Sequence, residues 1–514
     1  MRKFVLFSIS IAFMISLLFQ SCRQSGTNAV PFDSLLIAPF FDSHPELKKY
    51  ESELIEIYRN HNFTYIWFSK KNIAKYGNSL HSKVQNIEDE GIYTTFPYQE
   101  DIDDIFKNPR RYSRKQPGSD LLLTSLYLYY VDEVYKGIND SATTEIGWLL
   151  PRKEINYTVL LDSIISDKKL QHEYSPHLFS QYYQLRDVLQ RYREMKENGG
   201  WIQIEPEADH KGYKPKDTSQ VIQQIRERLY VSGEMKQNNK SNIYDDELLA
   251  AVTTFQTSHG FKPDSTISAG HIEAMNVPVD EYIKKIVVNM ERWRWITPDV
   301  FEAREFIFSN IPAYRMILFR DGKIEFDSPV VVGEIMTKTV IFDGMMSYIV
   351  FSPYWNLPKS IIEYEVLPGI EKNKHYLKNH NMEWNDGHVR QLSGKNNSLG
   401  LVKFMFPNSN DIYFHDSPAK SLFKREERAL SHGCVRVGKA RELAIKILEN
   451  DKDWPVEKID AAMNAGEETI CSLKNKIPVY IGYFTAWVDE EGRVNFYKDV
   501  YERDEKLAEL LFYK

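Results

Sequence analysis

The spacing of apolar residues predicts helices in the first part of the chain. Tyr182, Leu185, Leu189 and Tyr192 follow one another at spacings of 3, 4 and 3, which puts them on one face of a helix that ends before Gly199-Gly200. The apolar segment 120–137 also ends at a glycine, as helices often do. We therefore predict an α-helical scaffold domain over residues 30–205.

A smaller helical unit is predicted over residues 214–276. Asp245 stands where a helix N-cap is expected, because acidic residues and then an apolar stripe follow it. The two helices expected here bury two stripes: Val221, Ile222, Ile225 and Leu229, then Leu248, Val252 and Phe255. Another amphipathic segment predicts a helix within 279–300 that returns to the scaffold.

From Arg304 onward the period of the pattern changes to that of strands. Asp321-Gly322 separates two β-branched and aromatic runs, a strong hairpin signal, and Gly492 closes a second turn of this kind. We predict a mainly-β domain over 304–500. The alternation lapses in 359–402, which is polar and rich in His and Asn, so we expect an irregular inserted lid there. The fold class predicted for the whole chain is multidomain α+β.

The N-terminus has the pattern of an export signal. Basic residues at positions 2 and 3 precede an apolar run from Phe4 to Phe19, and Cys22 follows a small residue. This run is shorter than the roughly 20 residues that cross a membrane, which favours a lipoprotein-type signal peptide over 1–22 with lipid on Cys22. An uncleaved N-terminal anchor is the alternative. Either way we expect a membrane-tethered protein in the periplasm of the cell envelope.

The net charge and the number of cysteines limit the classes of function that we expect. The 514 residues carry a net charge of -7, which argues against a nucleic-acid-binding protein. With 3 cysteines, one of them assigned to lipidation, an exported chain is not held by a disulfide framework. A cysteine beside histidine is then a candidate nucleophile.

The stretch 414–437 holds such a cysteine. Cys434 lies two residues after His432 and 19 residues after His415. A thiol needs a proton acceptor to become a nucleophile, and either histidine fits at this point. Gly433 allows a sharp bend whose N–H groups converge, as an oxyanion site requires. The alternative is that Cys434 is a small buried residue and that both histidines are surface groups.

The residues around this cysteine resemble the signature of the L,D-transpeptidases, the YkuD-type catalytic domain. The resemblance covers "HDSP" and "SHGCVRV", and it extends to "SNIPAYRMILFRDGK", "SYIVFSPYWNLPKSI" and "RQLSGKNNSLGLVKFMFPN". The segment "AVTTFQTSHGFKPD" is similar to a peptidoglycan-binding helical repeat, although Ser265 stands where that pattern has glycine. The combination matches the large branch with a scaffold and a peptidoglycan-binding-like domain.

The resemblance implies a cysteine acyltransferase of cell-wall biogenesis that needs no metal or other cofactor. Cys434 would be the nucleophile and His415 the general base, in a thiolate–imidazolium pair, with a carbonyl near Asp416 holding the other ring nitrogen. Backbone N–H groups of His432, Gly433 and Cys434 would form the oxyanion hole. The thiolate would attack the third-residue carbonyl of a peptidoglycan tetrapeptide stem, release D-Ala and pass the acyl group to a neighbouring stem amine, giving a 3→3 cross-link.

Further residues are expected to bind substrate. Arg436 stands where the family pattern commonly has asparagine, and we expect its forked donors to bind a substrate carboxylate, with a structural ion pair as the alternative. Tyr354 and Trp355 are expected to line the cleft, with core packing as the alternative. Ser431 completes the predicted substrate-binding set. Cell-wall synthesis proteins are possible partners.

Rival functions stay open. One is a non-catalytic, lipid-anchored wall-binding protein, and another is an L,D-carboxypeptidase that uses water as acceptor. A metallohydrolase is the third, since His375, His380 and His388 cluster with Asp386, but their spacing and polar context indicate a solvated insertion.

Overall fold

The computed structural model describes residues 31, 33–68, 72–112, 116–166, 178–207, 211–296 and 303–512. They fall into two compact units: the first takes 1–84, 95–130 and 156–172, the second 85–94, 131–155 and 173–514. The predicted signal segment 1–22, with Cys22, lies outside the described residues. Among the helices that are described, none has the length and apolar character to cross a membrane.

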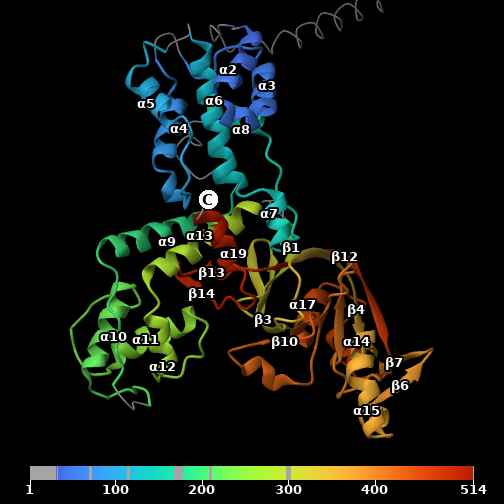
Figure 1. Ribbon diagram of the computed structural model, residues 1–514. Helices are drawn as coiled ribbons and strands as arrows, with labels where there is room; N and C mark the ends of the chain where they lie inside the picture. The colour runs from blue at the N-terminus through green and yellow to red at the C-terminus, as the bar shows by residue number, and fades with distance from the viewer. Residues whose placement is uncertain are drawn as a thin grey trace, which may run out of the picture. The chain divides into compact units, whose positions relative to one another are not determined.

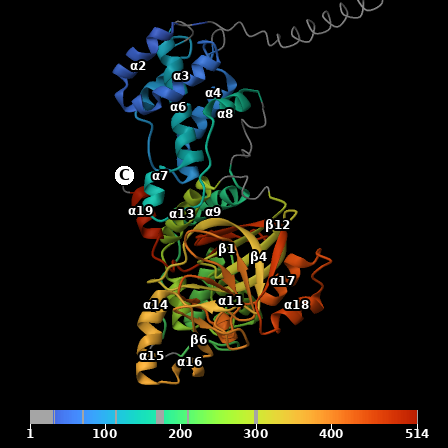
Figure 2. The same cartoon turned by 90° about the vertical axis from the view of Figure 1, so that its right-hand side faces the viewer.

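The first unit is helical and packs around a buried carboxylate. Asp120, on the apolar helix α6, accepts hydrogen bonds from the Tyr58 hydroxyl at 2.6 Å and from the N–H groups of Ile66 at 3.0 Å and Trp67 at 2.9 Å. Burial raises the pKa of Asp120 to about 6. Figure 2 shows α3, α4 and α8 beside α6. The helices are η1 Ser34–Leu36, α2 Ile37–Ser43, η2 Pro45–Tyr50, α3 Glu51–Asn60, α4 Lys75–Gln85, α5 Gln99–Lys107, α6 Pro117–Val131 and α8 Tyr157–Ser166.

The second unit begins with a layer of helices. The predicted stripe of Tyr182, Leu185, Leu189 and Tyr192 is buried on α9, which packs on α13. On α13 the buried Arg294 guanidinium donates to Glu291 at 2.7 Å, so this long helix keeps charged groups inside by pairing them. The helices are η3 Ile87–Glu90, η4 Asp132–Lys136, α7 Asp140–Glu145, α9 Ser180–Glu197, α13 Val279–Trp295 and α19 Asp504–Phe512.

A small helical group with its own core lies between α9 and α13 in the sequence. It comprises α10 Gln220–Val231, α11 Asp246–Ser258 and α12 Ala269–Met275. Asp245 caps α11 as predicted, because its side chain accepts from the Leu248 N–H at 3.0 Å. Both predicted apolar stripes lie in one buried cluster. We refer to residues 204–276 as the small helical domain.

The strands of the second unit close into a barrel. Within the described residues, nine strands run in the order β10-β3-β11-β9-β8-β4-β12-β1-β2, and β2 also pairs with β3. The predicted Asp321-Gly322 turn is confirmed, with positive φ at both residues and Arg320 paired with Lys323. The strands are β1 Glu305–Asn310, β2 Arg315–Arg320, β3 Lys323–Gly333, β4 Phe342–Phe351, β8 Val402–Met405, β9 Phe414–His415, β10 Ala429–Ser431, β11 Val435–Val437 and β12 Thr469–Gly482.

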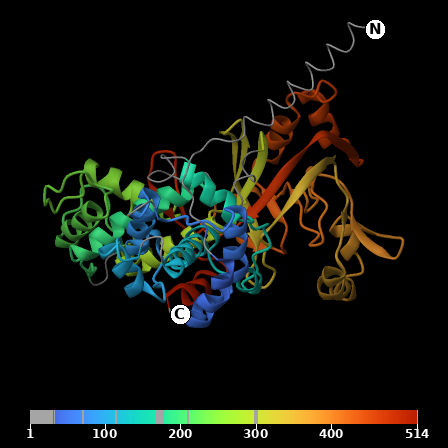
Figure 3. The same ribbon diagram turned by 90° about the horizontal axis from the view of Figure 1, so that it is seen from above.

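Short elements surround the barrel. The second predicted hairpin is confirmed as β13 Ala486–Val488 paired with β14 Val494–Phe496. The helices η7 Lys420–Lys424, α17 Ala440–Leu448 and α18 Val456–Met463 lie in the connections between strands. In Figures 1 and 3 the small helical domain, in green, and the inserted segment 355–391, in orange, lie on opposite sides of the barrel strands.

The segment 359–402 is inserted in the β domain as predicted, but the prediction that it is irregular is wrong, because it contains helices and strands. Its helices are α14 Lys359–Ile361, η6 Ile362–Val366, α15 Leu367–Lys372 and α16 Tyr376–Asn379 (Figure 2). Its sheet has the order β5-β7-β6, with β5 Trp355–Asn356, β6 Met382–Asn385 and β7 His388–Gln391. A small core of Leu357, Ile361, Val366 and Val389 holds it together. We call residues 355–391 the inserted subdomain.

Candidate active site

Two adjacent parallel strands bring the distant residues of the motif together. β9 pairs with β11 so that Phe414 lies opposite Val435 and His415 lies opposite Arg436. Phe414 and Val435 are fully buried in the barrel, and since side chains alternate along a strand, His415 and Arg436 share the other face. Cys434 directly precedes β11 at the end of this face. The 18 residues between His415 and Cys434 therefore connect two neighbouring strands, and we call this connection, which includes η7 and β10, the crossover loop.

Backbone and side-chain contacts fix the orientation of the His415 ring. Its Nδ1 lies 2.6 Å from the Asp416 carbonyl oxygen, so Nδ1–H donates there and Nε2 keeps its lone pair. The Asp416 carboxylate is itself held, because it accepts from Lys420 Nζ at 2.5 Å and from the Leu401 N–H at 3.0 Å. At Gly400, with φ of +63°, a Cβ would lie 2.4 Å from this carboxylate, so no larger residue fits without displacing Asp416. The predicted carbonyl near Asp416 is present, and Asp416 supplies it.

Burial makes the ring a neutral base. His415 is 5% exposed, and this burial, with the positive charge of Arg436, lowers the pKa of His415 to about 4. The carbonyls of Asp416 and Leu399 act in the opposite direction. At neutral pH the imidazole is therefore uncharged and able to accept a proton at Nε2.

The Cys434 thiol is half-buried and has two neighbours that the sequence prediction missed. Sγ lies 3.7 Å from the Asp411 carbonyl oxygen, and the Tyr413 side chain hydrogen-bonds to Cys434. The rings of Tyr413 and His415 are 5.8 Å apart, so the tyrosine contacts both groups. The alternation in "DIYFHDS" contains the signal for this, because Tyr413 stands two residues before His415 on the same face.

Burial also raises the pKa of the Cys434 thiol, while the Tyr413 hydrogen bonds and the charge of Arg436 favour the thiolate. With a raised thiol pKa and a lowered imidazole pKa, the resting protein holds a thiol beside a neutral ring. The predicted thiolate–imidazolium pair is not the resting state that this environment favours.

In the bend before Cys434, one of the three N–H groups predicted for the oxyanion hole is already hydrogen-bonded. The Gly433 N–H donates to Ser431 Oγ at 3.2 Å, and that hydroxyl donates to the Cys434 carbonyl at 2.6 Å. Ser431 is buried and both its bonds are internal, so neither it nor the Gly433 N–H can meet a substrate without rearrangement. In the part of the chain that the structure describes, the N–H groups of His432 and Cys434 have no hydrogen-bond acceptor. These two donors are the available ones.

A buried threonine anchors this bend to the C-terminal segment. Thr339 Oγ1 donates to the Gly433 carbonyl at 2.8 Å and accepts from the Gly333 N–H at 2.9 Å. The Tyr501 hydroxyl accepts from the Thr339 N–H at 3.1 Å and donates to the Gly333 carbonyl at 2.7 Å. Thr339 lies 94 residues before Gly433 in the sequence, and Tyr501 lies 68 residues after it. Distant parts of the chain therefore hold the nucleophile loop in place.

Arg436 is a half-buried cation on the same face as His415. Among the described residues no carboxylate lies within ion-pair distance of it, and its Nε is buried without a hydrogen-bond partner. The alternative of a structural ion pair is therefore not supported. An unpaired guanidinium beside the thiol favours a negative charge at this place.

The remaining predicted residues lie in or near the inserted subdomain. Trp355 packs against the core of that subdomain, and the Tyr354 ring lies 4.6 Å from the Arg390 guanidinium. Both side chains are half-buried. The His432 side chain is exposed and points toward the subdomain, where its Nε2 lies 3.6 Å from the Glu365 carboxylate. The His432 ring therefore makes a surface contact with Glu365, and we assign it no part in proton transfer.

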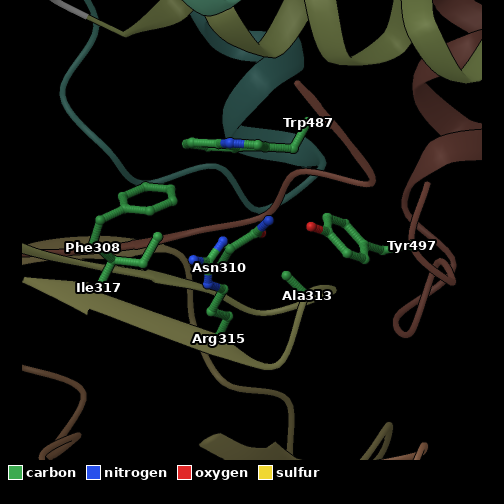
Figure 4. A pocket seen from close by; sticks show the side chains of 7 residues that line it. All are labelled: Phe308, Asn310, Ala313, Arg315, Ile317, Trp487 and Tyr497. Carbon is green, nitrogen blue, oxygen red and sulfur yellow. The ribbon is translucent and has the colours of Figure 1, made fainter. Parts of the chain in front are cut away.

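The histidines of the inserted subdomain do not form a metal site in the described part of the chain, and the hollow beside β1 and β2 is small. His380 Nδ1 bonds the Tyr376 carbonyl at 2.8 Å, and within the described residues no group of three His, Cys, Asp or Glu side chains could hold a metal ion. A hollow beside β1 and β2, lined by Phe308, Asn310, Ala313, Arg315, Ile317, Trp487 and Tyr497, has a volume of about 10 Å³ (Figure 4). That is room for about one water molecule.

Comparison with known families agrees with this geometry. Residues 304–457 match the model of the L,D-transpeptidase catalytic domain, YkuD, and residues 52–189 match that of the scaffold domain. The chain carries an L,D-transpeptidase catalytic domain. The His415 crossover, the Cys434 bend and every barrel strand except β12 lie within the matched L,D-transpeptidase range. The scaffold match begins in the first unit and ends on α9 of the second.

Individual relatives agree over part of their length. A Haemophilus influenzae protein named "Putative L,D-transpeptidase" is 32% identical over 250 residues, which are 44% of this chain and 50% of that protein. The chain thus spans about half the length of this curated relative. Solved L,D-transpeptidases from Mycobacterium smegmatis and Stackebrandtia nassauensis are 11% and 14% identical, with TM-scores of 0.20 and 0.22. The two alignments cover 35% and 54% of this chain, and they cover 58% and 97% of the two solved chains, respectively.

The electrostatics of the L,D-transpeptidase site predict the reactivity of its thiol. Because Arg436 favours the Cys434 thiolate, Arg436→Met should raise the thiol pKa and slow alkylation by iodoacetamide at pH 8 about twofold or more. Arg436→Lys keeps the charge and should react like the wild type. Peptide mass spectrometry separates Cys434 from Cys471, whose pKa burial raises to about 11 and which serves as the internal control. Equal rates in wild type and Arg436→Met would show that Arg436 does not act on the sulfur.

Proposed function

We propose that this protein is a peptidoglycan L,D-transpeptidase that works through a Cys434 thioester. The observation that carries the proposal is the shared face of β9 and β11, where a half-buried thiol lies beside an oriented, neutral imidazole and an unpaired guanidinium. This set contains a nucleophile, a base and a site for negative charge, which acyl transfer requires.

The proton moves only as the substrate reacts. His415 accepts the thiol proton at Nε2 while Sγ attacks the third-residue carbonyl of a tetrapeptide stem, and the ring cation forms next to the Asp416 carbonyl that already accepts from Nδ1. The N–H groups of His432 and Cys434 are the donors nearest the developing oxyanion. His415 then returns the proton to the leaving D-Ala amine, and the amine of a neighbouring stem resolves the thioester into a 3→3 cross-link.

Arg436 is proposed to bind a carboxylate of the donor stem. Its planar fork can hold a carboxylate in two hydrogen bonds, and it has no carboxylate partner among the described residues. The same cation lowers the pKa of His415 and favours the thiolate, so substrate binding would also change the electrostatics of the reacting pair.

We further propose that the protein is an envelope lipoprotein, facing the periplasm and tethered through Cys22. The support is the basic start, the apolar run 4–19 and the following cysteine. Peptidoglycan lies outside the cytoplasmic membrane, so an exported and tethered enzyme would be placed at its substrate.

Product analysis tests the reaction. With disaccharide-tetrapeptides, the purified protein should give free D-Ala and dimers joined through the third residues of both stems, identified by muropeptide mass spectrometry. Cys434→Ala and His415→Ala should reduce these products to background, because one removes the nucleophile and the other its base. Tripeptide and D-Ala without dimers would show a carboxypeptidase, and no product from folded wild type would show a wall-binding protein instead.

Metabolic labelling tests the tether. Cells given an alkynyl fatty acid should label the wild-type chain, and Cys22→Ser should lose the label and leave the membrane fraction. Cys471→Ser is the matched control, because that buried thiol lies in β12. Label that persists in Cys22→Ser would contradict lipidation at this residue.

A further inference from the structure

A basic cleft separates the small helical domain from the barrel. It has a volume of about 530 Å³ and lies between the turn at Gly260, Phe261 and Lys262 and the crossover-loop residues Phe423, Lys424, Arg425, Glu426 and Arg428. Figure 1 shows this loop, in deep orange near β10, extending toward the helices α11 and α12. Residues on both sides belong to the second compact unit.

The charge of this cleft opposes that of the whole protein. Four of the lining residues are cationic, namely Lys262, Lys424, Arg425 and Arg428, while the chain as a whole carries a net charge of -7. Within the described residues none of the four lies in an ion pair, and Arg428 Nε is buried without a hydrogen-bond partner. The one carboxylate of the lining, Glu426, accepts from the Lys262 N–H at 3.0 Å, which ties the two walls together. An unpaired group of cations in a concave site is a binding site for anions.

A short strand, β10, joins the wall of the cleft to the bend that carries the nucleophile. Arg428 precedes β10, and its carbonyl accepts from the Val332 N–H at 2.9 Å, so the loop is fixed to the barrel there. β10 then runs to Ser431, where the bend that ends at Cys434 begins. The three residues of β10 cover about 10 Å, which is less than the roughly 13 Å of an extended tetrapeptide.

We propose that this cleft binds peptidoglycan through the carboxylates of its stem peptides, and that it guides a stem along β10 to Cys434. The rings of Phe261 and Phe423 offer apolar surface beside the cations, which suits the sugar and methyl groups that alternate with carboxylates in this polymer. The proposal rests on the proposed function and extends it, since it assigns polymer binding to a surface shared by two domains and outside the catalytic face.

Co-sedimentation with isolated sacculi tests the cleft without requiring catalysis. In a Cys434→Ala background, the full-length chain should sediment with sacculi, and the triple change Lys262→Ala, Lys424→Ala and Arg425→Ala should weaken binding about tenfold or more. Arg428 is left in place because its guanidinium lies over the Tyr314 ring and its loss would disturb packing. Binding should also weaken with salt, as exposed ionic contacts do.

A charge-matched control distinguishes the effect of the cleft residues from the effect of a change in net charge. Lys236, Lys452 and Lys476 are exposed lysines that do not line the cleft, and their triple change to Ala removes the same charge. This control should bind like the parent protein. Equal binding by the cleft variant and this control would overturn the proposal.

Chemical blocking of the polymer tests the ligand class. Sacculi whose carboxylates have been converted to neutral amides should lose binding to the parent protein to the same extent as the cleft variant does with untreated sacculi. Undiminished binding to the neutral sacculi would overturn the assignment to stem carboxylates. Failure of the proposed function is distinguishable, because it would appear as absence of a carbapenem thioester on wild-type Cys434 by intact mass, whatever the sedimentation result.

Discussion

The hydrogen bond from His415 Nδ1–H to the Asp416 carbonyl, 2.6 Å long, decides what this site can do. It leaves the lone pair on Nε2, the nitrogen that must receive the thiol proton. The bond depends on neighbours that have no chemistry of their own: the Leu401 N–H and Lys420 hold the Asp416 carboxylate, and the absent side chain of Gly400 leaves room for it. A glycine, a lysine and a backbone amide thus set the tautomer of the base.

Burial then determines the charge of the reacting groups. The pKa of His415 is lowered and that of the Cys434 thiol is raised, both through loss of water, so the two are neutral partners until a substrate carbonyl arrives. Arg436 is the unpaired charge in this setting, and it favours the thiolate while disfavouring the imidazolium. A thiol stored in neutral form is less open to oxidation and alkylation, since the thiolate is the reactive species.

The sequence predicted the helical stripes, the hairpin turns and the two main residues of the site, because periodicity and turn chemistry are local signals and the motif is specific. Three features could not be predicted from the sequence, because they depend on how the chain folds. The side of the barrel that His415 shares with Cys434 depends on which strands pair, and the 18 residues that connect them do not specify that pairing. The Gly433 N–H was predicted to form part of the oxyanion hole, but it donates a hydrogen bond to the Ser431 side chain instead. The inserted subdomain was mistaken for an irregular lid because its core is small and most of its surface is polar.

If His415 takes the proton of a neutral Cys434 thiol, the pH dependence of acylation should show it. The rate at which a carbapenem acylates Cys434 in a single turnover should stay nearly constant from pH 6 to 8 in the wild type, because the base is already neutral above its pKa of about 4 and the thiol is still protonated. In His415→Ala only the thiolate can react, so the rate should rise about tenfold for each pH unit. A wild-type rate that rises with the same slope as that of His415→Ala would contradict the account.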